Sequence, residues 1–226
     1  MEKTNNKRPK MSLSFEFSKI NTWVFDLDNT LYPPKTNLFA QIEKRMTKWV
    51  MQTLELSQVH ADELRLQYWQ SYGTTLAGLM REHNVDPGPY LTDVHDISFA
   101  PLTPDPILAG YISALPGRRI VYTNGTADYA TKVIAARGLE GLFDAIYGVE
   151  DADLLPKPEF GAFDRVFAKD GFSRQTAAMF EDDPRNLQVP HAMGLKTILI
   201  SELPNSSPFI DHQAPDLSDF LAQLLL

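Results

Sequence analysis

With 226 residues, 43% of them hydrophobic, the chain is long enough and apolar enough to fold around a core, which excludes wholesale disorder. Its formal charge of −8 disfavours nucleic acid and anionic membranes as main partners, although a small phosphorylated ligand needs only a local cationic or metal site. The absence of cysteine excludes a disulfide framework, a thiolate nucleophile and a cysteine-ligated zinc ion.

The N-terminal segment is polar and basic over its first ten residues, and no apolar stretch follows as it would in a secretory signal. No apolar run elsewhere approaches the roughly 18 residues of a membrane span. We therefore expect a flexible tail over residues 1–19, no membrane partner and a cytoplasmic location.

The first predicted element is a strand over residues 21–28, whose β-branched and aromatic run is typical of a strand buried on both faces. Helices are predicted from Thr126 to Gly138, from Pro158 onward, and from Pro184 to near Gly194. Strands that alternate with helices predict an α/β fold with a Rossmann-like parallel sheet. The further predicted strands cover residues 119–124, 144–149, 177–182 and 196–200.

Residues 37–99 interrupt this alternation, because apolar side chains recur there at helical spacing and no strand pattern is present. The spacing predicts one long helix from Leu38 to Leu54, and Ser57 and Thr74 are positioned to cap two more. We expect a helical insert, or cap, over residues 37–99. The catalytic core would then combine residues 20–36 with 100–226, and residues 216–226 would form a packing helix.

Polar and acidic side chains follow several of the predicted strands. In an open parallel sheet, ligands bind beyond the carboxyl ends of the strands, so these side chains are expected to converge. Carboxylates gathered at one edge repel one another unless a cation neutralises them, and hard oxygen ligands favour magnesium over zinc. The side chains are Asp26, Asp28, Thr123, Asn124, Glu181, Asp182 and Asp183, with Lys157 in a loop between two strands.

Four of these segments, in this order, resemble the four signature motifs of the haloacid dehalogenase superfamily: Asp26-Leu-Asp-Asn-Thr30, Thr123-Asn124, Lys157-Pro158 and Asp182-Asp183. Within that superfamily the chain is similar to the pyrimidine 5′-nucleotidase-like phosphatases. That finer resemblance lies in residues 28–32, 72–79 and 102–106.

The resemblance implies a Mg²⁺-dependent hydrolysis of a phosphate monoester through an aspartyl-phosphate. Asp26 would be the nucleophile, and Asp28 the general acid and then the general base. A second acid at this position favours phosphoryl chemistry over dehalogenation, which does not need it. The other implied roles are phosphate binding by Thr123, the Asn124 amide and Lys157, and Mg²⁺ binding by Asp26, the Asp28 main-chain carbonyl and Asp182.

Some assignments stay open at this stage. Glu181 departs from the small or apolar residue that is commoner before the fourth motif, so Asp183 could replace Asp182 as the metal ligand. Tyr72 and Thr75 are candidate substrate contacts, although helix packing explains such residues about as well. The substrate is expected to be a small phosphate ester, most simply a pyrimidine nucleoside 5′-monophosphate. The alternatives are a sugar-phosphate or phosphoglycolate phosphatase, a mutase, or a catalytically idle binding protein on the same fold.

Overall fold

The computed structural model describes residues 12–226, and its centre is a six-stranded sheet in which all neighbouring strands run parallel. The strand order is β3-β2-β1-β4-β5-β6. Strands β2 and β3 are added on one side of β1 and strands β4, β5 and β6 on the other, so the switch point of the strand order lies between β1 and β4. This order confirms the predicted Rossmann-like α/β fold. The strands are β1 (Thr22–Phe25), β2 (Arg118–Tyr122), β3 (Ala145–Tyr147), β4 (Ala177–Glu181), β5 (Lys196–Ile200) and β6 (His212–Ala214).

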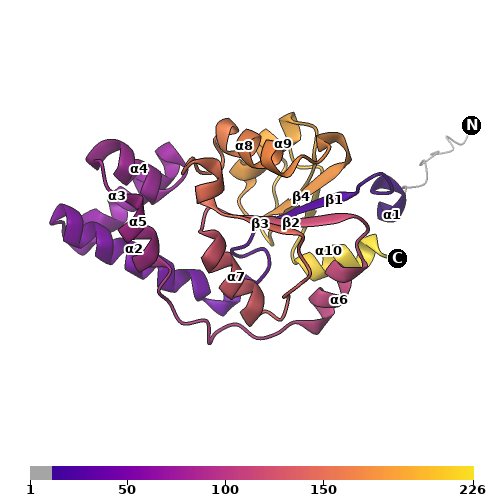
Figure 1. The fold of residues 1–226 in the computed structure, drawn as a ribbon, viewed down its shortest axis with the longest axis horizontal. Coiled ribbons are helices and arrows are strands. Elements are labelled where there is room, and N and C mark those ends of the chain that lie inside the picture. Colours follow the sequence, from indigo (N-terminus) through magenta and orange to yellow (C-terminus); the bar gives the residue numbers. More distant parts are fainter. Residues whose placement is uncertain (1–11) are drawn as a thin grey trace, which may run out of the picture.

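Helices cover both faces of the sheet, which explains why its strands are apolar on both sides (Figure 1). Trp23 and Phe25 of β1 belong to the apolar cluster with the helices on one face, whereas Val24 between them belongs to the cluster on the opposite face. Helices α8 (Phe160–Asp170) and α9 (Gln188–Ala192) cover the face of Val24. The other face is covered by α6 (Pro106–Ala114), α7 (Ala127–Ala136) and α10 (Leu217–Leu224).

Four helices between β1 and β2 form a separate group beside the sheet (Figure 1). The side chains of Ser57 and Thr74 cap the second and third helices as predicted, each accepting a hydrogen bond from a main-chain N–H. The helices are α2 (Leu38–Leu54), α3 (Gln58–Tyr72), α4 (Thr75–His83) and α5 (Pro87–Val94). Across residues 12–226, no helix combines the length and the apolar character needed to cross a membrane.

The structure corrects several predicted elements. The flexible tail is wrong for residues 12–19, because α1 (Leu13–Glu16) forms there and Phe17 packs into the core; residues 1–11 of that prediction lie outside the described residues. Strand β6 was missed because its short sequence lacks β-branched residues. The helix predicted from Pro184 divides into a 3₁₀ turn over 184–187 and α9, which places Pro190 in a first turn, where no main-chain N–H is needed.

Candidate active site

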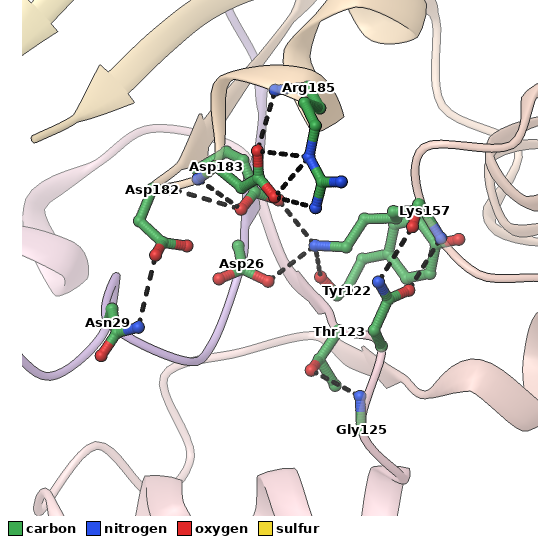
Figure 2. Close-up of polar contacts among 11 residues, drawn as sticks. Asp26, Asn29, Tyr122, Thr123, Gly125, Lys157, Asp182, Asp183 and Arg185 are labelled. Carbon is green, nitrogen blue, oxygen red and sulfur yellow. Dashed lines mark hydrogen bonds and ion pairs between the residues drawn. The ribbon is translucent and has the colours of Figure 1, made fainter. Parts of the chain in front are cut away.

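Lys157 holds together the ends of three neighbouring strands (Figure 2). Its Nζ lies 2.6 Å from Asp26 Oδ1, 2.7 Å from Glu181 Oε2 and 3.1 Å from the main-chain oxygen of Tyr122. These three acceptors match the three N–H groups of an ammonium, so the position of the head group is fully determined. Burial lowers the pKa of Lys157, but Asp26 and Glu181 outweigh it and leave that pKa above its ordinary value. The lysine therefore stays charged inside the protein.

The buried Asp26 and Glu181 and the half-buried Asp182 form an acidic group in which one carboxylate oxygen from each lies within 4.8 Å of the others. Burial and then Glu181 raise the pKa of Asp26 to about 8, and the same two causes raise the pKa of Asp182 well above its ordinary value. Three carboxylates face the single ammonium of Lys157, so the group is short of positive charge. Its oxygen-only donor set fits a hard divalent cation such as Mg²⁺.

The Glu181 carboxylate accepts hydrogen bonds both from Lys157 and from the loop that follows β4. Its Oε2 accepts from the lysine, and its Oε1 accepts from the main-chain N–H groups of Asp182 and Asp183, both at 3.2 Å. These contacts occupy both oxygens, which leaves Asp26 and Asp182 as the available carboxylate ligands. The sequence placed Glu181 among the side chains expected to converge at this edge and as a departure from the fourth motif, but it did not reveal the contact with Lys157, which lies 24 residues away in the chain.

The position of Asp182 relative to Asp183 distinguishes the two alternatives for the fourth motif. Asp182 belongs to the acidic group and accepts from Asn29 Nδ2 at 3.3 Å. Asp183 instead binds the Arg185 guanidinium through both carboxylate oxygens and caps the next turn by accepting from the Arg185 N–H. The geometry therefore favours Asp182 as the metal ligand.

Thr123 and Asn124 lie at the end of β2, beside the lysine loop. Asn124 Nδ2 donates to the main-chain oxygen of Lys157 at 3.1 Å, while the Lys157 N–H donates to Asn124 Oδ1 at 2.7 Å. This reciprocal pair occupies the Asn124 side chain, which ties two loops together, so a phosphate contact of Asn124 would fall to its main-chain amide. Thr123 Oγ1 accepts from the Gly125 N–H at 2.9 Å and still has its own hydroxyl proton to donate.

Asp28 does not join the acidic group through its side chain. Its Oδ1 accepts hydrogen bonds from Tyr32 and Tyr129, at 2.5 and 2.6 Å. The side chain nevertheless lines the same cavity of about 630 Å³ as Asp26, Thr123, Lys157 and Asp182. The strand ends thus converge as predicted, while the Asp28 carboxylate is directed by side chains that the motifs did not reveal.

A second cavity, of about 430 Å³, continues from Asp28 between the helices α2–α5. Thr75 lines this cavity, whereas Tyr72 lines neither cavity and instead donates to Glu82 at 2.5 Å. Two polar atoms of its lining residues, Tyr90 Oη and Arg65 Nε, are buried and have no hydrogen-bond partner among the described residues. Its apolar lining includes Phe39, Ile42, Met46, Leu76, Leu91 and Val94.

Comparison with known proteins places the chain in a family. The model of the haloacid dehalogenase-like hydrolase family matches residues 23–200, so the chain belongs to that family. Over 191 residues it is 24% identical to Phosphate metabolism protein 8 of Saccharomyces cerevisiae (strain ATCC 204508 / S288c). That alignment covers 77% of this chain and 60% of the yeast protein.

Solved structures of this family have the same fold. A HAD phosphatase from Thermococcus onnurineus matches with a TM-score of 0.61 and 16% identity, over 91% of this chain and 98% of the other. The HAD-hydrolase YfnB from Bacillus subtilis, bound to magnesium, matches with a TM-score of 0.59 and 16% identity, over 92% and 99%. L-2-haloacid dehalogenases are also among the similar structures. At these identities the likeness shows the fold.

Proposed function

We propose that this hydrolase uses Mg²⁺ to remove phosphate from a pyrimidine nucleoside 5′-monophosphate, carrying the phosphoryl group on Asp26. The observation that carries the proposal is the Asp26 carboxylate held 2.6 Å from Lys157 Nζ, beside Asp182 and facing a cavity. Phosphoryl transfer depends on such positioning and charge stabilisation. In this proposal the helices of residues 37–99 are the cap, and residues 20–36 and 100–226 are the core.

The first step transfers the phosphoryl group to the protein. A carboxylate oxygen of Asp26 attacks phosphorus, and the bond between phosphorus and the ester oxygen breaks. Asp28 donates a proton to that oxygen, so that the nucleoside leaves as an alcohol. In the second step Asp28 takes a proton from a water molecule, whose oxygen attacks phosphorus and releases phosphate from Asp26. The Thr123 hydroxyl binds a phosphoryl oxygen, and the Lys157 ammonium, whose three N–H groups already have acceptors, stabilises the charge of the phosphoryl group from its place beside Asp26.

Asp26 and Asp182, with the main-chain carbonyl of Asp28, are the proposed Mg²⁺ ligands. When bound, Mg²⁺ would offset the repulsion between a carboxylate and a phosphate dianion. The raised pKa values of Asp26 and Asp182 support this assignment, because a neighbouring cation favours the ionised carboxylate that a nucleophile requires.

The cavity between α2 and α5 supports a nucleoside as the leaving group. Its wall is largely apolar, which suits the faces of a heterocyclic base better than the hydroxyl groups of a sugar phosphate. The Tyr90 hydroxyl and the Arg65 Nε–H, which have no partner among the described residues, lie buried behind this wall, and a shift of the wall would let a base carbonyl accept from them. A sugar phosphate would place polar hydroxyl groups against most of this apolar wall.

Phosphate release from a panel of esters tests the proposal. The panel contains pyrimidine and purine nucleoside 5′-monophosphates, hexose phosphates and phosphoglycolate, each assayed with Mg²⁺ and with a chelator. We expect Mg²⁺-dependent release that is greatest for the pyrimidine nucleotides. Equal rates across the panel would reject the nucleotide specificity, and release from no ester would reject the phosphatase.

A further inference from the structure

The Asp28 carboxylate has two very different oxygens. Oδ1 accepts hydrogen bonds from the hydroxyls of Tyr32 and Tyr129, at 2.5 and 2.6 Å, and both tyrosines are 1% exposed. Oδ2 has no hydrogen-bond partner in residues 12–226. Asp28 lines both cavities of the site, so an oxygen without a protein partner lies where substrate would bind.

Both phenols are held in the donating form. Burial and then the Asp28 charge raise the pKa values of Tyr32 and Tyr129 far above the ordinary value of a phenol. Each hydroxyl therefore keeps its proton and can only direct it to an acceptor, which is Oδ1. Two short hydrogen bonds to one carboxylate oxygen restrict rotation of the Asp28 side chain.

The two tyrosines are themselves fixed from different parts of the molecule. Tyr32 lies four residues after Asp28, in the buried loop that follows β1. Tyr129 lies in the first turn of α7, and its ring stacks on His95 with 4.4 Å between centroids and 9° between planes. His95 ends α5, so the helical group contributes to the support of Tyr129.

We propose that Tyr32 and Tyr129 are positioning residues that turn Asp28 Oδ2 toward the ester oxygen of the substrate. This inference rests on the proposed phosphatase function. Oδ2 carries the proton that passes to the leaving oxygen, and it later receives a proton from the hydrolytic water. A carboxylate free to rotate would spend part of its time with both oxygens away from that path, and such misplacement lowers the rate of proton transfer.

A purely structural role is the competing explanation, because a buried carboxylate needs hydrogen bonds in any case. The choice of leaving group separates the two roles. A nucleoside alkoxide needs a proton to leave, whereas p-nitrophenolate leaves without one. Loss of Asp28 positioning therefore slows the first step for the nucleotide but spares it for p-nitrophenyl phosphate. Structural damage to the site slows that step for both substrates.

The experiment compares Tyr32→Phe and Tyr129→Phe with Asp28→Asn and with Tyr147→Phe. Tyr147 is a matched control because its hydroxyl donates to Asp170, away from the site, at 2.9 Å. Single-turnover rates are measured with uridine 5′-monophosphate and with p-nitrophenyl phosphate, together with the steady-state rates. Thermal unfolding with Mg²⁺ verifies that each variant folds.

For either tyrosine variant we expect a fall of about tenfold to a hundredfold in the single-turnover rate with the nucleotide, with little change in KM. The single-turnover release of p-nitrophenol should stay within about threefold of the unmodified protein, while the steady-state rate falls because water attack still needs Asp28. Asp28→Asn should show the same pattern more strongly. Tyr147→Phe should change none of these rates.

Two results overturn the inference. Equal losses in the single-turnover rates of both substrates would assign the tyrosines a structural role, as would unchanged nucleotide rates in both folded variants. The unmodified protein tests the proposed function independently: if it releases phosphate from neither ester, both proposals fail together. If the unmodified protein hydrolyses both esters, but neither tyrosine variant loses more of its single-turnover rate with the nucleotide than with p-nitrophenyl phosphate, only the positioning role fails. If one variant does not fold, the other still removes one donor from Oδ1.

Discussion

The strand-end region and the helix-lined cavity differ in whether their buried polar groups have hydrogen-bond partners. At the strand ends, Lys157 is saturated by Asp26, Glu181 and a main-chain oxygen, so charge is paired inside the protein. In the wall of the cavity between α2 and α5, Tyr90 Oη and Arg65 Nε are buried and have no hydrogen-bond partner within residues 12–226. An unpaired buried donor costs stability unless a ligand satisfies it. Under the proposed function, the chain itself preorganises the reacting groups, whereas the pocket for the leaving group is completed by the substrate.

The largest expected effect comes from removing the proposed nucleophile. Asp26→Asn keeps the size of the side chain and its place beside Lys157 but cannot form an acyl phosphate, so we expect kcat to fall by about 10³-fold or more. Phosphate release, and mass spectrometry of trapped phosphoprotein, check this result. Substantial residual activity with a phosphoprotein still present would place the nucleophile at another residue.

Removing the Lys157 ammonium from the acidic group should have the next largest effect. Lys157→Met leaves the Asp26, Glu181 and Asp182 carboxylates without their partner, and losing one member of a buried ion pair costs about 3 kcal/mol of the free energy of unfolding. Urea unfolding without metal measures the loss, and added Mg²⁺ should restore part of it. In the matched variant Lys169→Met, which breaks a surface pair with Asp151, we expect little change. Equal losses of unfolding free energy in the two variants would show that the buried Lys157 pairs stabilise the protein no more than the surface pair of Lys169 does.

Removing the Tyr90 hydroxyl from the cavity wall should weaken nucleotide binding and raise the free energy of unfolding. Tyr90→Phe removes a buried hydroxyl that has no partner among the described residues, so we expect the protein to gain up to about 1 kcal/mol in the free energy of unfolding. KM for a pyrimidine nucleotide should rise about fivefold, through the loss of one hydrogen bond to the base. KM for p-nitrophenyl phosphate, which carries no base, should not change. A fall in stability with unchanged nucleotide KM would show that the hydroxyl serves the fold.

The last expected effect is a pH dependence of stability at the contact between the two regions. Burial lowers the pKa of His95 to about 4, against an ordinary value of about 6.5. Between these values the unfolded chain binds a proton that the folded protein does not, so stability falls as the pH drops from 6.5 toward 4. We expect a loss of about 1–2 kcal/mol between pH 7 and pH 5, relative to His95→Phe, which preserves an aromatic ring against Tyr129. Parallel unfolding curves for the two proteins at both pH values would contradict this.

Much of the candidate site was predictable because its residues follow strands. Asp26, Thr123 and Asp182 each come at or just after a strand end, and parallel strands bring their carboxyl ends to one edge. Pairings between distant segments were not predictable in the same way. Tyr129 lies 101 residues from Asp28, and nothing in the spacing of the motifs connects them.

By itself, the amino-acid sequence determined the parallel sheet, the helical insertion after its first strand and the edge where acidic side chains and a lysine gather. These follow from apolar periodicity and from strand ends, which are properties of short segments. Three features were decided only by the tertiary structure: Glu181 binds Lys157, one carboxylate oxygen of Asp28 accepts hydrogen bonds from two phenols, and the wall of the pocket contains buried donors that have no partner among the described residues. Side-chain direction and hydrogen-bond satisfaction depend on neighbours brought together by packing, so no local pattern carries them.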